Sequence, residues 1–263
     1  MIYNALLHNF NSASSKADVV TIDLADAPKF VDKFHAKGQR VVCYFSGTQI
    51  EDQRYDKNEW IAAKIAIPGA YANKSERRNQ YVDIRNRSKL EPLLRGRFRK
   101  ARSYGCDGVE VDNLGLYNHK DDIKELRSYT PDDTVVFATW LGKAARDEGI
   151  SIGLKNVATI SPKLEPYFDF AVVENCASSS NVCNYYTSFT KRNKAVFMVH
   201  YEDRGFHLSG SSLKNLINEA GGRKFTCVIT PAYGLKTHST TYNCSSGSVI
   251  SGSGKYIYIC FNY

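Results

Sequence analysis

The sequence contains no run of 18 or more apolar residues, so no membrane-spanning helix is expected. Its opening stretch, MIYNALLHNF, lacks the charged start and long apolar core of a signal peptide. No two cysteines have the CxxC spacing of a zinc or thioredoxin-like site. No GxGxxG follows an early strand-like run, and GxxxxGK[ST] and GxSxG are absent. These absences argue against a membrane partner, a zinc or redox site, nucleotide binding and a Ser/His/Asp hydrolase.

The chain is long and apolar enough to form one large core. Its 263 residues are 43% hydrophobic and 12% aromatic, and this length suits a single α/β barrel as well as two small domains. No repeat or linker divides it, apart from a Ser/Gly-rich segment at 245–254. We therefore predict one domain over residues 1–263, with a C-terminal decoration at about 232–263.

Basic residues outnumber acidic ones by 35 to 27, which gives a formal charge of +8. A dense basic run, RNRSKLEPLLRGRFRKAR, occupies 85–102. On a helix this run places Leu90, Leu93, Leu94 and Phe98 on one side and most of the Arg and Lys on the other, as in a solvated amphipathic helix. Because no motif that reads DNA or RNA accompanies the run, a nucleic-acid partner is not expected.

The seven cysteines are an odd number, which implies at least one free thiol. Cys176 and Cys183 flank the short polar loop ASSSNV, and we predict that they are bonded. Cys43 and Cys106 lie in strand-like runs, and we predict that they are buried thiols. Three Asn-X-Ser sequons are also present, at Asn73, Asn86 and Asn243. Together these features favour a secreted, extracellular protein.

Short apolar runs bounded by turn residues predict nine strands, at 2–8, 18–24, 40–46, 80–84, 106–112, 151–156, 169–175, 195–201 and 225–231. Helical patterns lie between many of them, at 26–38, 88–104, 132–148, 184–192 and 211–220. Strand followed by helix, repeated along the chain, favours a parallel sheet. We predict an α/β fold, a (β/α)8 TIM-type barrel with an additional strand, and keep an open doubly wound sheet as the alternative.

Polar residues recur where the predicted strands end. In the run GVEVD, alternation places Glu110 and Asp112 on one face, although burying an acid is costly unless it is paired or faces a wet cavity. In a parallel barrel the carboxyl ends of the strands form the rim at which substrates bind. We therefore predict that one rim gathers the side chains of Asp23, Tyr44, Asp83, Asp112, Lys155 and Glu174.

Six stretches occur in the order and spacing of a known family: RVVCYFSGTQIEDQRYD, YVDIR, GCDGVEVDN, GISIGLKN, YFDFAVVENC and KAVFMVHYE. Over residues 1–205 the chain resembles glycoside hydrolase family 114, the endo-α-1,4-polygalactosaminidases. The resemblance implies a (β/α)8 barrel with an extra strand and an endo-acting hydrolase of galactosamine-containing α-1,4-glycans. It implies no metal and no organic cofactor. We expect a monomeric enzyme whose partner is its polysaccharide.

By position, the family's catalytic carboxylates correspond to Asp112 in EVDN and Glu174 in VVENC. Glycoside hydrolysis needs two carboxyl groups beside the bond, one carrying a proton and one ionised. We predict a retaining reaction with Asp112 as nucleophile and Glu174 as general acid/base, because the apolar run FAVV before Glu174 favours its protonated form. Other residues expected to line an acidic groove, suited to glycans with some free amines, are Asp23, Tyr44, Asp83, Glu110, Asn113, Lys155 and His200.

Two positions depart from the family pattern, and both remove negative charge. Gly115 stands where the family typically has an aspartate, and His200 stands where it usually has an acid. Because a galactosamine polymer is cationic, these changes leave open its degree of acetylation, or another α-linked glycan. A non-catalytic carbohydrate-binding barrel is an alternative, and a basic nucleic-acid-associated protein is another. The presence of both Asp112 and Glu174 favours turnover.

Overall fold

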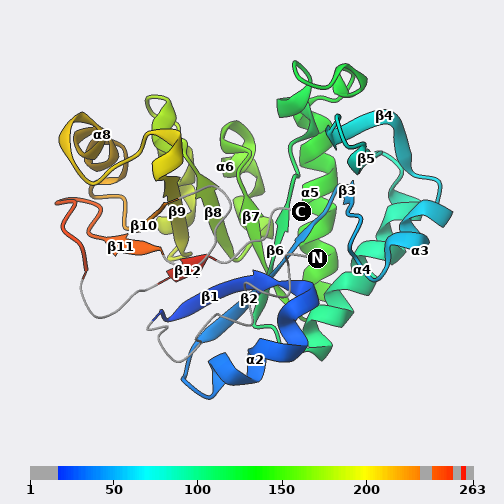
Figure 1. The fold of residues 1–263 in the computed structure, drawn as a ribbon, viewed down its shortest axis with the longest axis horizontal. Coiled ribbons are helices and arrows are strands. Elements are labelled where there is room, and N and C mark those ends of the chain that lie inside the picture. Colours follow the sequence, from blue (N-terminus) through cyan, green and yellow to red (C-terminus); the bar gives the residue numbers. More distant parts are fainter. Residues whose placement is uncertain (1–16, 232–238, 251–255, 259–263) are drawn as a thin grey trace.

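The computed structural model describes residues 17–231, 239–250 and 256–258, and its main element is a curled nine-stranded sheet (Figure 1). The order is β11-β10-β9-β8-β7-β6-β2-β1-β12, and only β10 and β11 pair antiparallel. The strands are β1 (Val19–Asp23), β2 (Arg40–Ser46), β6 (Gly108–Asp112), β7 (Ser151–Lys155), β8 (Phe170–Glu174), β9 (Val196–Tyr201), β10 (Thr226–Thr230), β11 (Thr240–Tyr242) and β12 (Tyr256–Tyr258).

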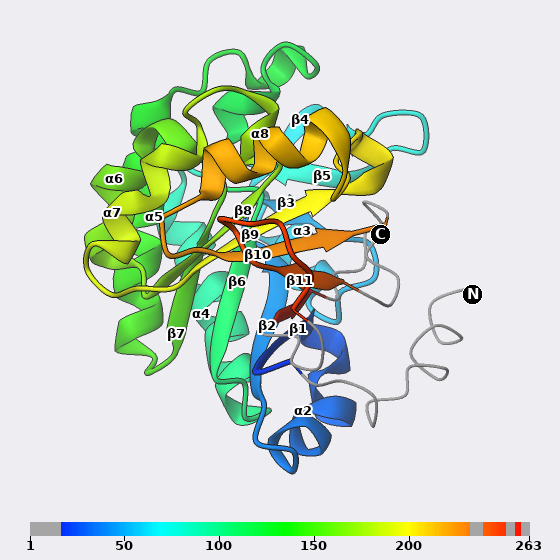
Figure 2. The ribbon, with the colours of Figure 1, turned by 90° about the vertical axis from the view of Figure 1, so that its left-hand side faces the viewer.

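Helices connect the parallel strands and lie on the outer side of the curve (Figures 1 and 2). They are α2 (Ala27–His35), α3 (Lys57–Ala62), α4 (Arg87–Ser103), α5 (Pro131–Asp147), α6 (Ser161–Leu164), α7 (Thr187–Thr190) and α8 (Gly210–Ala220). α2 packs on β2, α4 on β6 and α5 on β7. This arrangement confirms the predicted TIM-type α/β fold. Among the helices of the described residues, none is both long and apolar enough to span a bilayer.

Seven of the nine predicted strands match strands of the main sheet, and the strand predicted at 2–8 lies outside the described residues. The strand predicted at 80–84 is not part of the main sheet. It corresponds to β5 (Arg78–Val82), which pairs antiparallel with β3 (Gln49–Ile50) and β4 (Ala66–Asn73) in a separate sheet beside α3. The interpretation of Asp83 as the end of a barrel strand is therefore wrong. Alternation identifies a half-buried strand but not the sheet to which it belongs.

Residues 232–263, expected as a decoration, contribute to the main sheet in their described parts. β11 pairs with β10, and β12 pairs in parallel with β1 at the opposite edge. Figure 2 shows these two short strands near one another beside β1 and β10. Among the described residues no ladder joins β11 to β12.

Two apolar cores lie on the two faces of the main sheet. The larger packs the outer face against the helices and includes Cys43, Phe45, Val109 and Val111. The smaller fills the inside of the curve, with Tyr44, Val172, Phe197, Val199, Tyr201 and Val228. Because side chains alternate along a strand, the neighbours of the outward residues Val109 and Val111 point inward. This alternation directs Glu110 and Asp112 toward the inside of the curve.

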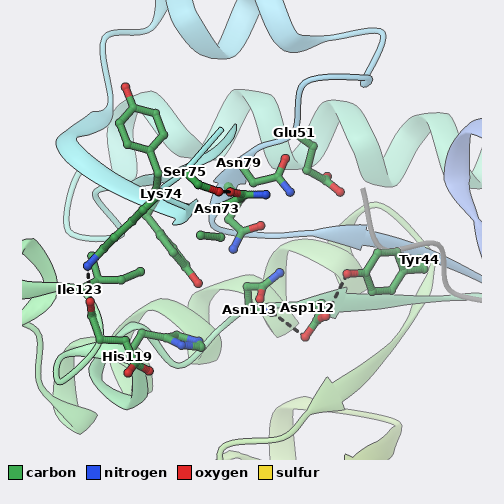
Figure 3. A pocket seen from close by; sticks show the side chains of 15 residues that line it. Tyr44, Glu51, Asn73, Lys74, Ser75, Asn79, Asp112, Asn113, His119 and Ile123 are labelled. Atoms are coloured by element: carbon green, nitrogen blue, oxygen red, sulfur yellow. Dashed lines mark hydrogen bonds between the residues drawn. The ribbon is translucent and has the colours of Figure 1, made fainter. Parts of the chain in front are cut away.

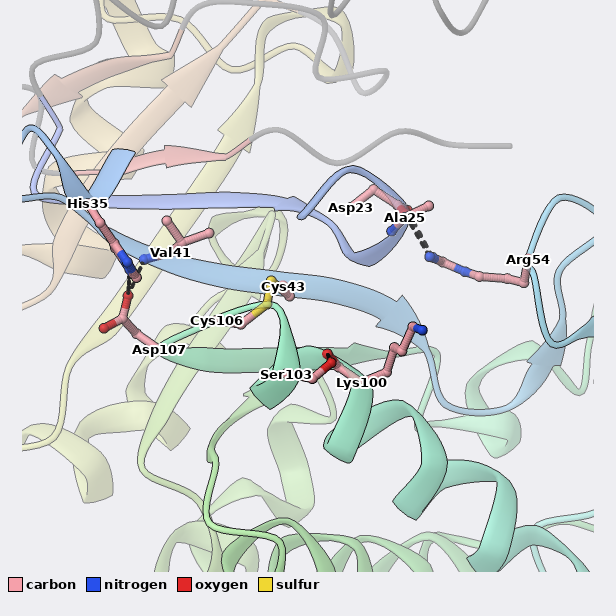
Figure 4. The surroundings of a disulfide bond; sticks show 10 residues. All are labelled: Asp23, Ala25, His35, Val41, Cys43, Arg54, Lys100, Ser103, Cys106 and Asp107. Carbon is pink, nitrogen blue, oxygen red and sulfur yellow. Dashed lines mark hydrogen bonds and ion pairs between the residues drawn. A yellow bond between two sulfur atoms is a disulfide. The ribbon is translucent and has the colours of Figure 1, made fainter. Parts of the chain in front are cut away.

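Three disulfide bonds tie the described residues together: Cys43–Cys106, Cys176–Cys183 and Cys227–Cys244. The predicted Cys176–Cys183 bond is confirmed. The prediction that Cys43 and Cys106 are free thiols is wrong (Figure 4). Cys43 lies on the outer face of β2, and Cys106 lies two residues before the neighbouring strand β6, but their separation of 63 residues hides this proximity in the sequence. Cys260 lies outside the described residues.

The basic run at 85–102 forms α4 largely as predicted, with Leu90, Leu94 and Phe98 buried. One of its basic residues departs from the solvated-face interpretation. Arg97 is only 1% exposed and forms ion pairs with Asp56 and Glu51. Burial of its charge is possible because these partners desolvate together with it.

Candidate active site

Three adjacent strands bring an ammonium group and three carboxylates together at their carboxyl ends. Lys155 ends β7, between Asp112 at the end of β6 and Glu174 at the end of β8. The Lys155 Nζ lies 2.7 Å from Glu110 Oε1, 3.8 Å from Asp112 Oδ2 and 3.5 Å from Glu174 Oε2. We call these four residues the Lys155 cluster. One cation faces three acids, so the cluster attracts a further positive charge or a proton.

The acids of the Lys155 cluster differ in how far their side chains are exposed. The side chains of Glu110 and Lys155 are 0% and 1% exposed, whereas those of Asp112 and Glu174 are 19% and 13% exposed. Glu110 is therefore the internal partner that allows the lysine to be buried. Asp112 and Glu174 are the two acids that a substrate can contact.

Donors hold both oxygens of Asp112. The Tyr44 hydroxyl donates to Oδ2 at 2.9 Å, and the backbone N–H of Asn113 donates to Oδ1 at 2.7 Å (Figure 3). Asn113 in turn donates from its side-chain amide to the Ser46 hydroxyl at the end of β2. The carboxylate is thus fixed in orientation by two neighbouring strands, which is the preorganisation that a reacting group requires.

Glu174 is held by a second set of donors. The side-chain amide of Asn156 donates to Oε2 at 3.1 Å, and the Tyr201 hydroxyl donates to Oε1 in a short hydrogen bond. Asn156 also accepts a hydrogen bond from the backbone N–H of Glu174. The carboxyl group therefore lies in a polar shell, so the expectation of an apolar setting for Glu174 is not met.

An asparagine follows the last residue of each of these three strands and takes a left-handed conformation. Asn113, Asn156 and Asn175 have φ values of 63°, 55° and 51°. Asparagine tolerates this region better than most residues, because its side chain bonds locally. The reversed backbone turns each chain segment away from the sheet directly after Asp112, Lys155 and Glu174.

Two cavities meet at Asp112. The larger, of about 750 Å³, extends toward the β4–β5 hairpin and is shown in Figure 3, and the smaller, of about 330 Å³, contains Lys155 and Glu174. Asp112, Asn113 and His119 line both. Burial lowers the pKa of His119 below its usual 6.5, although the nearby Asp112 and Asp122 charges act in the opposite direction. The two cavities form a groove with the exposed acids at its centre.

Three of the predicted groove residues lie elsewhere in the fold. Asp23 is fully buried and binds the Arg54 guanidinium through both oxygens, at 2.6 and 2.9 Å. Asp83 follows β5 and accepts a hydrogen bond from Tyr129. His200 is fully buried, and its Nε2 accepts from the backbone N–H of Ala177.

Sequence reasoning missed Tyr186 and His119, which line the groove, and Tyr201, which donates to Glu174. Alternation along β9 could have identified Tyr201, because Tyr201 shares the inner face of the strand with Val199. The adjacent residue, His200, must then point outward. Tyr186 and His119 lie in short 3₁₀ segments, Cys183–Tyr186 and Leu116–His119. No strand or helix period marks such segments in the sequence.

Within the described ranges, no group of three or more His, Cys, Asp and Glu side chains has an arrangement that could hold a metal ion. What the groove does offer is a pair of exposed, hydrogen-bonded carboxyl groups at the carboxyl ends of parallel strands. Two carboxyl groups at the rim of such a barrel are the arrangement that glycoside hydrolysis requires.

The model of glycoside-hydrolase family GH114 matches residues 3–247, so the chain belongs to this family and is a glycoside hydrolase. The comparison with curated proteins found no match. The chain is similar to the crystal structure of Aspergillus fumigatus Ega3 in complex with galactosamine, at 27% identity and a TM-score of 0.70, covering 84% of this chain and 86% of Ega3.

The chain is also similar in fold to the glycoside hydrolase domain of PelA from Pseudomonas aeruginosa. A variant of that domain is 13% identical with a TM-score of 0.55, covering 81% of this chain and 87% of the domain. A second structure of the domain is 14% identical with a TM-score of 0.51, covering 83% and 94%. These likenesses support the barrel fold.

Proposed function

We propose that this enzyme is secreted and cleaves α-1,4-linked galactosamine-containing polysaccharide internally, with Asp112 and Glu174 as its catalytic carboxyl groups. The observation that carries the proposal is the Lys155 cluster: two exposed acids on one lysine, at the centre of a groove, in a GH114 chain similar to a protein solved with galactosamine. Three disulfides suit an oxidising, extracellular setting.

The geometry of the acids favours retention of configuration. Asp112 Oδ2 and Glu174 Oε2 lie 3.8 and 3.5 Å from the same nitrogen, so their separation cannot exceed the total of the two distances, about 7.3 Å. This bound includes the separation of about 5–5.5 Å typical of retaining enzymes and excludes most of the inverting range of about 6.5–9.5 Å.

The roles follow from what each acid must do in a retaining reaction. Asp112 lies where the two cavities meet, and as nucleophile its carboxylate attacks the anomeric carbon while the glycosidic C–O bond breaks. Glu174 gives its proton to the departing oxygen and later removes one from the attacking water. The Tyr201 hydroxyl can both donate and accept, so it can serve Glu174 in either protonation state.

The charge of the groove suits an aminoglycan despite the basic surface of the whole chain. The Lys155 cluster carries one cation and three acids, while on the wall of the larger cavity the charge of Asp122 is offset by that of Lys74. Nearby acids attract a cationic polymer at the short range where it binds. We expect tighter binding of a partly deacetylated galactosamine polymer than of polygalacturonate.

Product analysis tests the proposal. The enzyme should be incubated with galactosamine polymers of several degrees of acetylation and with α-linked neutral and acidic glycans, and new reducing ends should be counted by size. Oligomers of intermediate size from galactosamine polymers alone are the expected result. Binding without any new reducing ends would favour a non-catalytic barrel. Cleavage of a different α-linked glycan alone would overturn the proposed substrate.

A further inference from the structure

His119 is a polar residue at the point where the two cavities of the groove meet. It lines both of them, as do Asp112 and Asn113. The Tyr44 hydroxyl and a backbone N–H already bond the oxygens of Asp112, and the side-chain amide of Asn113 donates to Ser46. Within the described part of the chain, no group forms a hydrogen bond with the ring nitrogens of His119. His119 is therefore the residue of this junction that a substrate can engage.

The ring of His119 is held by packing. The residue ends the 3₁₀ segment Leu116–His119 and is half-buried. Its ring centroid lies 5.7 Å from that of Tyr81 on β5, and Tyr81 is itself only 2% exposed. Figure 3 shows the imidazole extending toward Asn113 and Asp112. This packing directs the ring toward the carboxylate that the proposed reaction uses as nucleophile.

The imidazole of His119 is neutral above about pH 6.5. Burial lowers its pKa below the usual 6.5, and the negative charges of Asp112 and Asp122 oppose this only in part. The charged groups that line the two cavities with His119 are Glu51, Lys74, Asp112, Asp122, Lys155 and Glu174. A neutral imidazole has one N–H donor and one nitrogen that accepts a hydrogen bond. Because Asp112 and Asp122 are negative, they favour a cationic donor beside this ring.

The proposed reaction brings an amino group to the same place. Asp112 attacks the anomeric carbon, and in a galactosamine unit the carbon that bears the amine is bonded directly to the anomeric carbon. The amine of the attacked unit must therefore lie close to Asp112. Hydrogen bonds to the substituent on this carbon strengthen in the transition state of glycoside hydrolysis. A residue beside Asp112 with an acceptor nitrogen is thus placed to recognise the amine.

We infer that His119 is a specificity-determining residue whose acceptor nitrogen receives a hydrogen bond from the amino group of the sugar unit that Asp112 attacks. The inference rests on the proposed function, because it takes Asp112 as the attacking group. A protonated imidazole has no acceptor and repels an ammonium group, so binding should weaken as the pH falls. By the same linkage, binding of an aminosugar should lower the pKa of His119.

An NMR titration of the His119 ring tests this inference without turnover. The pKa of His119 should be measured in the parent enzyme alone, with saturating galactosamine, and with galactose, which carries a hydroxyl in place of the amine. The signal is assigned by its loss in His119→Gln. We expect galactosamine to lower the pKa of His119 by at least about 0.5, and galactose to lower it less. An unchanged or raised pKa with galactosamine, or an equal change with both sugars, would overturn the inference.

Two substitutions of His119 test its role in cleavage of a de-N-acetylated galactosamine oligomer. Leucine removes the acceptor, so His119→Leu should reduce kcat/KM about 10- to 100-fold at about pH 7.5, the loss of one hydrogen bond to a charged group. Glutamine keeps an acceptor oxygen but does not titrate, so His119→Gln should stay within about threefold of the parent. His35→Gln is the matched control, because His35 bonds Asp107 at the opposite end of β6.

The pH dependence of KM separates this role from a merely structural one. Below about pH 6.5 the KM of the parent should rise relative to that of His119→Gln. Both proteins keep Asp112 and Glu174, so the difference between their curves reports on His119. Parallel curves, or equal losses of kcat/KM in His119→Gln and His119→Leu, would contradict the inference.

The NMR titration also separates this inference from the proposed reaction. A lower His119 pKa with galactosamine, in an enzyme that does not cleave the polymer, would support the amine contact and refute the reaction. Cleavage of the polymer by an enzyme whose His119 pKa does not respond to galactosamine would refute the contact and leave the reaction standing.

Discussion

Two buried ionic clusters lie near the carboxyl ends of the strands, and they differ in how completely their charges are paired. In the Lys155 cluster a single cation serves three acids, two of which reach a cavity. The second cluster, which we call the Arg54–Arg97 cluster, joins two guanidinium groups to Asp23, Glu51 and Asp56. The comparison shows that buried acids alone do not mark a candidate active site; acids that share one cation and reach a cavity do.

Every acid of the Arg54–Arg97 cluster is held by directional bonds. Arg54 binds Asp23 and Glu51, each through two nitrogen–oxygen contacts, and Asp23 also caps the backbone N–H of Ala25 (Figure 4). Arg97 binds both oxygens of Asp56 at 2.7 and 2.9 Å. Burial alone would raise the pKa of Asp56, but the Arg97 hydrogen bonds and charge lower it overall.

The Arg54–Arg97 cluster also explains how the loop after β2 is fixed. Arg97 donates to the backbone carbonyl of Ser46, and Glu51 accepts from the backbone N–H of the same residue. Glu51 reaches the wall of the larger cavity, but its oxygens are engaged by Arg54. The Arg54–Arg97 cluster therefore supports the groove, whereas the Lys155 cluster lies open within it.

The largest expected effect is on the Lys155 cluster. Glu174→Gln should reduce kcat by about 10²- to 10⁴-fold, because the amide preserves the shape but carries no transferable proton. With an activated aryl glycoside, whose leaving group needs no proton, azide should restore part of the activity of Glu174→Ala. Steady-state rates and product NMR measure this effect. If azide instead rescued Asp112→Ala with a retained product, the two roles would have to be exchanged.

The next effect concerns the Arg54–Arg97 cluster. Arg97→Met should lower the free energy of unfolding by about 3–5 kcal/mol, because it leaves Asp56 buried without its cation. Arg99→Met, on the same helix, is the matched control. Arg99 is 59% exposed and pairs with Glu148, so its loss should cost about 0–1 kcal/mol. Urea unfolding measures both, and equal losses would show that burial of Arg97 does not matter.

Loss of the disulfides Cys43–Cys106 and Cys176–Cys183 should have different effects on stability and on activity. Cys43–Cys106 closes a separation of 63 residues and Cys176–Cys183 one of 7, so replacing each pair by alanine should cost about 4 and about 2 kcal/mol, respectively. Only the second pair lies next to Glu174 and the loop to Tyr186, so its loss should also reduce kcat/KM roughly tenfold. A larger loss of activity from the Cys43–Cys106 variant would contradict this division.

Much of the barrel could be predicted from the sequence, because apolar runs and helix signals are local. The side chains that lie at its rim were harder to predict. Asp23 and Asp112 both end a strand after an apolar residue, but their distant partners differ: Asp23 binds Arg54, 31 positions away, whereas Asp112 accepts from Tyr44 and reaches a cavity. His200 and Tyr201 are adjacent in the sequence, but adjacent residues of a strand point to opposite faces of the sheet. The role of each acid was thus set by long-range partners.

A further effect is expected only at acidic pH, where the stability should depend on His200. Burial lowers the pKa of His200 from 6.5 to about 3. Between these values the unfolded chain binds a proton that the folded chain does not, so this contribution to stability is full above about pH 6.5 and is lost as the pH falls.

His200→Gln should therefore flatten the curve of unfolding free energy against pH below 6.5, by up to about 1.4 kcal/mol per pH unit. The amide oxygen of glutamine can still accept from the backbone N–H of Ala177. His207→Gln, at an exposed position, serves as the control. Urea unfolding across this range provides the curves. Parallel curves for the parent and His200→Gln would show that His200 titrates alike in both states.

The most direct measurement compares the same substitution in the two clusters, Asp112→Asn and Asp23→Asn, by kcat on a partly acetylated galactosamine polymer and by Tm. Asp112→Asn should lose kcat by a factor of about 10³ or more with a Tm within about 3 °C of the parent. Asp23→Asn should lower Tm by about 10 °C, while the folded protein keeps kcat within about tenfold of the parent. Near-normal turnover by Asp112→Asn, or loss of turnover by a fully folded Asp23→Asn, would contradict the assignment of catalysis to the Lys155 cluster.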